Sequence, residues 1–213
     1  GLVLDYDGTA VETSRRGHPP AFKVTSQLIR LLEGGVPVSF ATGRGGSIGE
    51  ELRQVIPASL WPLVRLGLYN GAAMFGLGDA PRAVPTAADI TAFMEAMARH
   101  PKMARLVPLT KTQPYQVSVT AQEPMTPVGL REEIVRAWDV GELPRLRAFC
   151  SGHSVDVLSN GVSKLNVCRS LARALGVDET ALLCIGDSGA WPGNDYELLA
   201  SPMSLSVDNL SPE

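Results

Sequence analysis

The segment Gly1-Leu-Val-Leu-Asp-Tyr-Asp-Gly-Thr9 places two carboxylates directly after a short apolar run. Small and apolar residues in this order are typical of a buried strand, and Gly8 allows a turn after it. On an extended chain Asp5 and Asp7 point the same way. Like charges this close resist joint ionisation unless a cation lies between them or one carboxylate holds a proton. The segment therefore predicts either a Mg²⁺ site at the end of a strand or a polar turn that caps the strand.

The composition is that of an ordinary globular protein. The chain has 213 residues, of which 45% are hydrophobic and 19% charged, so it can bury a core as one large domain or two small ones. The formal net charge is −3, and no run of Lys or Arg indicates a surface for nucleic acid or anionic membrane. No apolar run approaches the roughly 20 residues of a membrane span. We therefore expect neither nucleic acid nor membrane as a partner, and the patterns specify no oligomeric state.

Cysteine and histidine usage indicates neither a zinc site nor a disulfide framework. The cysteines are Cys150, Cys168 and Cys184, and the histidines are His18, His100 and His153. The cysteines are widely separated with no CxxC spacing, and the histidines do not cluster, so we assign none of them to a metal. This usage fits a reducing compartment, and we expect a cytoplasmic protein. The sequence has no signal-peptide pattern, although it begins inside a strand and is compatible with a removed leader.

Strand and helix patterns alternate in the first part of the chain. Apolar residues keep helical spacing over 24–32, and Gly34-Gly35 ends that helix. A short apolar strand at 36–41 is followed by a helix at 47–56 and a third strand at 63–69. Strand, helix, strand, helix is the order of a parallel sheet with right-handed crossovers.

The same alternation returns after residue 160. Residues 165–175 have a helical apolar face that ends at Gly176, and 181–185 read as a buried strand. A further helix at 195–199 and a strand at 203–207 complete the pattern. We therefore expect a doubly wound, Rossmann-like α/β core formed by residues 1–72 and 159–213.

Residues 73–158 have a different character and predict an inserted α+β domain. We expect strand pieces at 74–75 and 82–84, a helix from Thr86 with a capping box completed by Asp89, and a helix that begins at Pro127. Alternation at Tyr115, Val117 and Val119 indicates a strand covered on one face. Further strands are expected at 146–150 and 155–158. Together these helix and strand units, with their one-sided patterning, predict an α+β insert with an open sheet.

Polar residues follow the predicted core strands. Asp5, Asp7 and Thr42 lie at carboxyl ends of strands, where open α/β sheets bind ligands, and Asp187 follows a later strand in the same way. Lys164 is placed at the start of a helix, where the helix dipole disfavours a cation. Either this lysine neutralises the carboxylates and a bound anion, or it is an ordinary surface residue. Asp187 is either a third metal carboxylate or a solvated loop residue.

Taken together, four motifs resemble those of the haloacid dehalogenase (HAD) superfamily of phosphohydrolases. In chain order they are LDYDGT, ATGR, SK and GDSGAWPGND. YNGA before the insert and VDVLSNGVSKLNV after it resemble the Cof-type and sucrose-phosphatase-like branch, which places an α/β cap between the second and third motifs. The resemblance covers essentially the whole chain. It implies an α/β fold, namely a doubly wound HAD core with an inserted α+β cap that contributes substrate specificity.

The resemblance also implies a role for each matched residue. Asp5 would be the nucleophile that forms an aspartyl-phosphate, and Asp7 the acid that protonates the leaving alkoxide and then activates water. Thr42 would hydrogen-bond the transferring group, and Lys164 would neutralise charge. Mg²⁺ would be held by Asp5, the backbone carbonyl of Asp7, and Asp187. Further candidates are Gly43, Arg44 and Asn70 for substrate binding and Ser188, Asn194 and Asp195 as orienting groups. Arg44 and Asn70 have plain alternatives as a surface residue and a turn former.

The expected function is Mg²⁺-dependent hydrolysis of a phosphate monoester of a small metabolite, with a sugar phosphate favoured. Branches of the superfamily that cleave carbon–halogen or carbon–phosphorus bonds lack the second aspartate, so Asp7 favours phosphate esters. One alternative is a phosphomutase that uses the same aspartyl-phosphate. Another is a non-enzymatic phospho-accepting module, although receiver domains are about half this length and carry no insert.

The sequence departs from the family pattern in three places. Residues 190–193 stretch the fourth motif, which puts the roles of Asn194 and Asp195 in question. Within this stretch Trp191 either covers the site or packs against the cap, and we expect a buried anchor. After DGT, the residues Ala10-Val11-Glu12 are a weaker match, and the chain stops soon after Val207.

Overall fold

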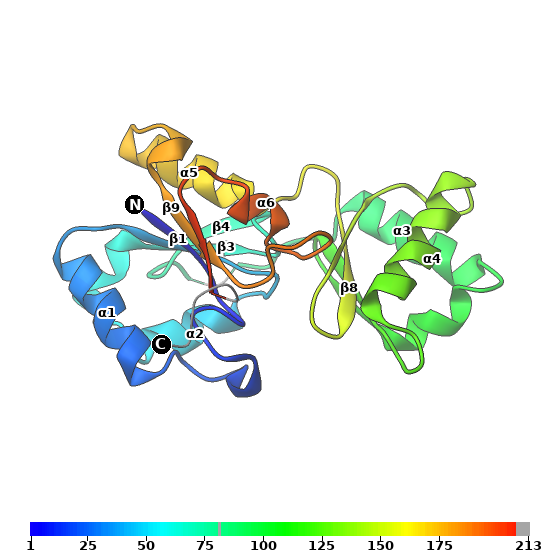
Figure 1. Cartoon of the computed structure of the whole chain (residues 1–213), viewed down its shortest axis with the longest axis horizontal. Coiled ribbons are helices and arrows are strands. Elements are labelled where there is room, and N and C mark those ends of the chain that lie inside the picture. Colours follow the sequence, from blue (N-terminus) through cyan, green and yellow to red (C-terminus); the bar gives the residue numbers. More distant parts are fainter. Residues whose placement is uncertain (81, 208–213) are drawn as a thin grey trace. The chain divides into compact units, whose positions relative to one another are not determined.

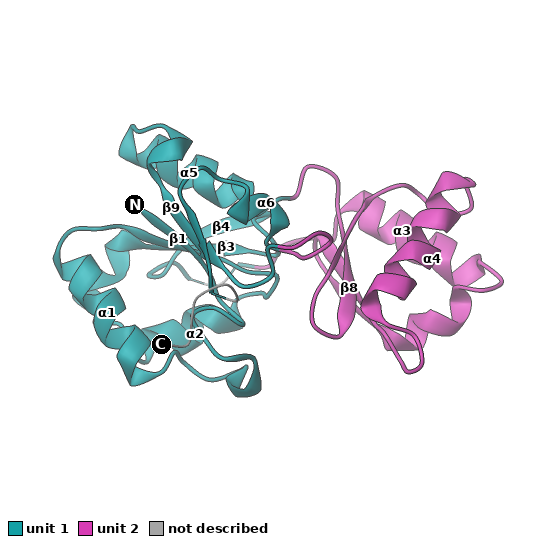
Figure 2. Cartoon of the chain, viewed as in Figure 1, with its two compact units in different colours: residues 1–82, 163–189, 195–213 teal, residues 83–162, 190–194 magenta. Residues whose placement is uncertain are grey.

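The computed structural model describes residues 1–80 and 82–207 and divides the chain into two compact units. The first unit comprises Gly1–Arg82, Ser163–Gly189 and the residues from Asp195 onward. The second comprises Ala83–Val162 and the short segment Ala190–Asn194 (Figures 1 and 2). Each unit has its own sheet and its own apolar core, and each is described by itself.

A six-stranded sheet forms the centre of the first unit, with the strand order β10-β9-β1-β2-β3-β4. All neighbours pair in parallel except β3 and β4. This confirms the predicted doubly wound α/β arrangement. The strand expected at 74–75 in the insert pairs with β3, so it extends the core sheet instead. The strands are β1 (Leu2–Asp5), β2 (Val38–Ala41), β3 (Val64–Leu68), β4 (Ala73–Gly76), β9 (Leu183–Gly186) and β10 (Ser204–Ser206).

Helices cover both faces of this sheet (Figure 1). They are α1 (Phe22–Glu33), α2 (Ser47–Arg53), α5 (Leu165–Leu175) and α6 (Tyr196–Leu199). Because side chains alternate along a strand, Leu2 and Leu4 pack with residues of α1 and α2, whereas Val3 packs with residues of α5. α2 ends three residues earlier than expected, ahead of Pro57, whose ring disfavours helical geometry in the residue before it.

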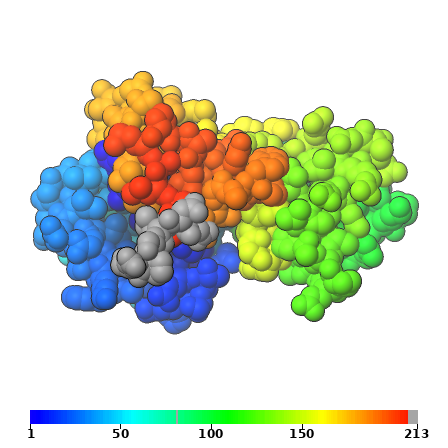
Figure 3. Space-filling view, viewed as in Figure 1, coloured from blue at the N-terminus to red at the C-terminus, as the bar shows by residue number. Residues whose placement is uncertain are grey.

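Short 3₁₀ turns connect several of these elements, at Thr13–Arg15, Ala58–Leu63 and Glu179–Ala181. The space-filling view shows blue N-terminal residues beside orange and red residues from the last third of the chain (Figure 3). Beneath this surface the buried strand β1 pairs with β9, although the two strands are far apart in the sequence. Within residues 1–80 and 82–207, no helix is both long and apolar enough to cross a membrane.

The second unit has the predicted α+β fold with an open sheet, and both of its helices pack in one core with that sheet. Its antiparallel strands have the order β5-β6-β8-β7, and residues of β6 such as Val117 and Val119 pack with the two helices. Trp138 of α4 and Phe93 of α3 belong to the same core. The elements are α3 (Ala88–Arg99), a 3₁₀ turn (Ala104–Leu109), β5 (Thr110–Gln113), β6 (Gln116–Thr120), α4 (Pro127–Asp139), β7 (Arg147–Cys150) and β8 (Ser154–Leu158).

Three local predictions for the insert were wrong. Residues 82–84 form no strand, and β5 was missed because this edge strand lacks an apolar alternation. The capping box at Thr86 does not form, since α3 begins after Ala87. The carboxylate of Asp89 accepts instead from Ser159 Oγ at 2.8 Å and from the Asn160 amide at 2.9 Å. Pro127 does begin α4 as expected.

Candidate active site

The sheet order brings three candidate segments to one edge. β1 lies between β2 and β9, with Asp5 opposite Ala41 on one side and Leu4 opposite Ile185 on the other. Asp5 therefore ends the central strand of the three, while Thr42 and Asp187 follow its two neighbours. Since parallel strands end at the same edge, residues remote in the sequence are brought together there, as the sequence predicted.

Lys164 is a buried cation between two carboxylates. It occupies the N-cap position of α5 and is 2% exposed. Its Nζ donates to Asp5 Oδ1 at 2.6 Å and to Asp195 Oδ1 at 2.5 Å. The lysine is thus not an ordinary surface residue. A buried charge without a partner is costly in free energy. The ammonium of Lys164 offsets this cost by pairing with the two buried carboxylates.

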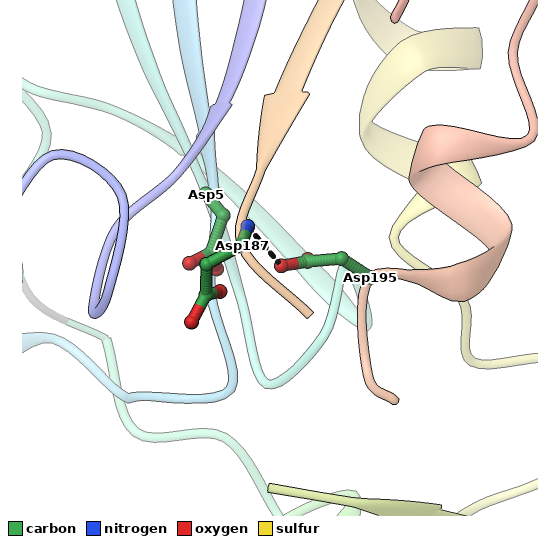
Figure 4. Close-up of side chains that lie close together, drawn as sticks. All are labelled: Asp5, Asp187 and Asp195. Carbon is green, nitrogen blue, oxygen red and sulfur yellow. Dashed lines mark hydrogen bonds between the residues drawn. The ribbon is translucent and has the colours of Figure 1, made fainter. Parts of the chain in front are cut away.

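Asp187 lies against the turn that follows the first motif. Gly8 has φ +94°, and a Cβ atom at that position would lie 2.2 Å from Asp187 Oδ2. Only glycine therefore fits both the backbone and the space. One oxygen each from Asp5, Asp187 and Asp195 lies within 4.8 Å of the others, and Figure 4 shows the carboxylates of Asp5 and Asp187 side by side.

Asp195 holds the loop that carries Asp187. Its Oδ2 accepts from the Asp187 amide at 3.1 Å (Figure 4) and from the Ser188 amide at 3.2 Å. The stretched motif therefore leaves Asp195 inside the cluster, with Ser188 beside it. Asn194 differs, since it belongs to the second unit and no described residue donates to its buried Oδ1.

Trp191 was expected to be a buried anchor, and this expectation was wrong in part. Its side chain is 57% exposed. It does pack within the second unit, where its ring contacts Phe149 edge-on with centroids 6.1 Å apart. The guanidinium of Arg131 lies 4.7 Å from the centroid of the indole. Contacts on part of the ring leave the rest open to solvent.

Burial and mutual repulsion dominate the electrostatics of the cluster. Burial raises the pKa of Asp5 to about 8, and the neighbouring Asp195 adds to this effect. Burial likewise raises the pKa of Asp187 to about 6. Burial opposes ionisation of Asp195 and Lys164 too, but the attraction between them prevails. The pKa of Asp195 is consequently lowered and that of Lys164 raised, so this pair stays ionised.

Asp7 is held apart from the three clustered carboxylates. Its Oδ1 accepts from Arg44 Nη1 at 3.2 Å, and Arg16 lies 3.6 Å away on the solvent side. Arg44 is itself fixed by a close ion pair with Glu51, which also accepts from the Tyr6 hydroxyl at 2.9 Å. Arg44 is predicted to bind substrate, and in this structure its guanidinium contacts the carboxylate of Asp7.

Sequence reasoning missed Tyr6, Arg16 and Glu51. Glu51 carried a usable signal, because it falls on the same helical face as Ile48 and Leu52, which are buried in the core. A carboxylate on an apolar helix face requires a cation or a donor nearby. Arg44, seven residues earlier, meets that requirement.

Thr42 and Asn70 belong to one loop network. The Asn70 amide donates to the Thr42 carbonyl at 2.7 Å, and the Arg44 amide donates to Thr42 Oγ1 at 3.1 Å, across Gly43. Asn70 has φ 56°, in the left-handed region, and its side chain is buried. Asn70 thus combines a turn role with a place beside the second motif.

The donor set of the cluster fits a hard divalent cation. All its side-chain donors are carboxylate oxygens, which Mg²⁺ prefers, and no cysteine or histidine belongs to it. Mg²⁺ binds oxygen at about 2.0–2.1 Å, so oxygens around one ion lie within about 4.2 Å of each other. The cluster is close to that size. Asp195 already bonds Lys164 and two amides, which leaves Asp5 and Asp187 as the better ligands.

Comparisons with known proteins identify the fold of the chain. No protein-family model and no curated protein matches the chain. Among solved structures, a phosphatase of the HAD superfamily from Bacteroides thetaiotaomicron is similar with TM-score 0.65 and 19% identity, over 94% of this chain and 80% of that one. The sucrose-phosphatase of Synechocystis sp. PCC6803 is similar with TM-score 0.65 and 20% identity, over 99% and 83%.

A sugar phosphatase of HAD subclass IIB is also similar, with TM-score 0.62 and 16% identity over 94% of this chain and 84% of that one. These structures span both units of the chain, including the inserted α+β unit. The solved structures similar to this chain thus include HAD phosphatases, two of them named for sugar substrates. The chain therefore has the fold of the HAD superfamily phosphatases.

Proposed function

We propose that this protein is a Mg²⁺-dependent phosphohydrolase that cleaves a phosphate monoester of a small metabolite through an aspartyl-phosphate on Asp5. The observation that carries the proposal is the position of Lys164 Nζ, which lies 2.6 Å from Asp5 although the two residues are 159 apart in the sequence. A buried ammonium beside a buried nucleophile suits attack on a phosphate dianion. Asp187 and Asp195 complete the same cluster.

In the proposed reaction Asp5 attacks phosphorus and the ester oxygen leaves. Both reactants are negative, so positioning and charge neutralisation supply most of the catalysis. Lys164 offsets the charge of Asp5 and of the incoming phosphate. Asp5, Asp187 and the Asp7 backbone carbonyl would hold Mg²⁺, which would neutralise negative charge on the phosphoryl oxygens.

Asp7 is the proposed acid and base. It would protonate the leaving alkoxide and then take a proton from the water that hydrolyses the aspartyl-phosphate. The contact with Arg44 fixes its carboxyl group near the first motif. Thr42 Oγ1 already accepts from the Arg44 amide, so its own proton can be donated to a phosphoryl oxygen. Gly43 and Asn70 would line the same side.

A sugar phosphate is the favoured substrate, and the second unit is the proposed cap that selects it. Two of the similar structures are named as a sugar phosphatase and a sucrose-phosphatase. A cap that closes over a site excludes water and bulky substrates, which suits a small metabolite. All three cysteines are free, in keeping with the proposed cytoplasmic location.

The proposal is tested by screening the purified protein against a panel of phosphorylated metabolites and measuring free phosphate. We expect release that a chelator of divalent cations abolishes and added Mg²⁺ restores. An Asp187→Asn variant should need far more Mg²⁺ than the parent. A rate of phosphate release that changes neither with the chelator nor with this substitution would contradict the proposal.

The same experiment separates the two alternatives. A phosphomutase would convert a sugar 1-phosphate into the 6-phosphate with little free phosphate. A phospho-accepting module would form a stable phosphoprotein and release almost nothing. Product analysis and the lifetime of the phosphoenzyme distinguish these outcomes from hydrolysis.

Stabilisation by Mg²⁺ should increase with pH. The folded-state pKa values of Asp5 and Asp187 lie above the usual 3.8, at about 8 and about 6. Between roughly pH 4 and pH 8 the folded state therefore holds protons on these groups that the unfolded state has lost, and their contribution to stability falls as pH rises. Mg²⁺ must displace these protons, so its apparent affinity should rise by up to about tenfold per pH unit for each proton displaced.

The measurement is the shift in melting temperature that a fixed Mg²⁺ concentration produces at about pH 5 and about pH 8. The shift should be several times larger at the higher pH, and Asp187→Asn should remove most of it. A shift that is equal at both values, or larger in acid, would show that these carboxylates do not bind the ion.

A further inference from the structure

The stretched fourth motif forms a short segment, residues Ala190–Asn194, that belongs to the second unit while both of its ends are joined to the first. Gly189 before it and Asp195 after it are assigned to the first unit (Figure 2). The chain therefore passes between the two units at this segment as well as at the two ends of the insert. We call residues 190–194 the anchor segment.

The anchor segment is fixed to β7 of the second unit by its backbone. The Cys150 amide donates to the Pro192 carbonyl at 2.7 Å, and Gly193 forms a parallel bridge with Cys150. Inside the segment the Gly193 amide donates to the Ala190 carbonyl at 2.6 Å, which closes it into a tight turn. The segment therefore behaves as an additional strand piece on the edge of the second sheet.

Trp191 adds side-chain contacts to this attachment. Its ring meets Phe149 of β7 edge-on, at an interplanar angle of 78°, and Arg131 of α4 lies over the indole. Arg131 is held in place because its Nε donates to the Ala148 carbonyl at 2.9 Å. Edge-on aromatic pairs and cation–π contacts are both attractive, so a single side chain links the segment to a strand and a helix.

The two ends of the same loop are fixed to the proposed metal site. The Asp195 amide donates to the Ser188 carbonyl at 3.1 Å, and Asp195 Oδ2 accepts from the Asp187 and Ser188 amides. The fit is close, since a Cβ atom at Gly186 would lie 2.8 Å from Asp195 Cγ. Residues 190–194 thus connect this fixed loop directly to β7 of the second unit.

We infer that Trp191 is a positioning residue. Its contacts attach the anchor segment to the second unit, and this attachment helps to fix the arrangement of Asp187 and Asp195. The inference rests on the proposed function for its kinetic consequences. The anchor segment is then the element through which the cap influences metal binding, without any residue of the cap having to touch the metal.

Loss of the Trp191 contacts should loosen the metal-binding loop. In Trp191→Ala we expect the Mg²⁺ concentration for half-maximal stabilisation to rise about tenfold and kcat to fall about tenfold, the range found when residues behind metal ligands are changed. KM for a small generic ester such as p-nitrophenyl phosphate should change much less. Amide hydrogen exchange at residues 187–189 should become faster. Trp191→Phe keeps an aromatic edge and should recover most of each loss.

A matched control is Val140→Ala, which removes an apolar side chain that is 64% exposed on the same unit. It should leave Mg²⁺ binding and exchange at 187–189 unchanged. Arg131→Gln removes the cation above the indole and provides a second variant if Trp191→Ala folds poorly. It should show a smaller change in the same direction.

The outcomes separate this inference from the proposed function. If Trp191→Ala and Arg131→Gln bind Mg²⁺ with the parental affinity and show parental amide hydrogen exchange at residues 187–189, the inference fails. This holds even if the second unit melts at a lower temperature and phosphate release continues. If the parent cleaves no phosphate ester but Mg²⁺ binding still weakens in Trp191→Ala and vanishes in Asp187→Asn, the proposed function fails and the positioning role stands.

Discussion

Substitution of Asp5 by Asn should abolish phosphate release while the protein stays folded. An amide cannot form the acyl phosphate, so the proposed two-step route would be lost, and we expect the rate to fall at least about a thousandfold. The side chains have the same shape, and Asp5 is a buried carboxylate whose pKa is raised by burial and by Asp195. Removing its charge relieves repulsion within the cluster, so without Mg²⁺ the variant should melt at the same or a higher temperature than the parent.

Three measurements distinguish a lost nucleophile from a damaged fold. Phosphate release, the melting temperature without Mg²⁺ and the shift produced by Mg²⁺ should be compared for Asp5→Asn and the parent. Asp178→Asn is a suitable control, because Asp178 caps a 3₁₀ turn at the surface and should leave release unchanged. Residual release by Asp5→Asn above about a tenth of the parental rate would exclude Asp5 as the covalent nucleophile.

The expected combination of lost activity and retained stability is itself informative. A carboxylate kept only for packing would show the reverse, with stability falling and a surviving rate. The buried cluster of Asp5, Asp187 and Asp195 is costly in the absence of a cation, since burial disfavours every ionised member. Such a cost is typical of a functional site.

The core of the site could be predicted from the sequence because its polar residues directly follow buried strands. Asp5, Thr42 and Asp187 each follow a buried strand, and parallel strands expose their carboxyl ends at one edge. Lys164 was predictable for a different reason, since a cation at a helix start is unfavourable unless an anion compensates it. Strand patterns and the helix dipole thus indicated these positions, and the resemblance to the HAD superfamily implied their roles.

Side-chain partners could not be predicted in the same way. Asp7 and Arg44 are paired through the geometry of two loops, and Glu51 joins them from a helix whose end was itself misplaced. β4 was assigned to the insert because four half-buried residues carry no signal that tells one sheet from another. The expectation of a buried Trp191 was wrong in part because the residue type alone does not reveal how much of the ring its neighbours cover.

Substitution of Lys164 by Met should destabilise the first unit by about 3–5 kcal/mol, the cost of removing one partner of a buried ion pair. For a protein of this size that corresponds to a fall in melting temperature of about 10 °C. Lys164 contacts Asp5 and Asp195 at 2.6 and 2.5 Å, and both carboxylates are buried. Methionine fills similar space without charge, so the loss reflects electrostatics more than packing.

The destabilisation should depend on pH in a defined direction. In the parent the pKa of Lys164 is raised above its ordinary value of 10.5 by its two carboxylate partners, so its contribution is complete below that value and is lost only in strong alkali. In Lys164→Met the carboxylates must instead take up protons, which becomes harder as pH rises. The gap in melting temperature between parent and variant should therefore widen from about pH 5 to about pH 8.

A double substitution decides whether the charge balance is the cause. If Lys164→Met is destabilising because it strands the carboxylate of Asp195, then Lys164→Met with Asp195→Asn should be more stable than Lys164→Met alone, although both lack the lysine. Mg²⁺ should also restore part of the lost stability in the single variant, since a divalent cation among the carboxylates replaces the missing charge. If the double variant is instead less stable than Lys164→Met and Mg²⁺ has no effect, Lys164 stabilises the protein through packing, and its proposed role in neutralising the phosphate loses its physical basis.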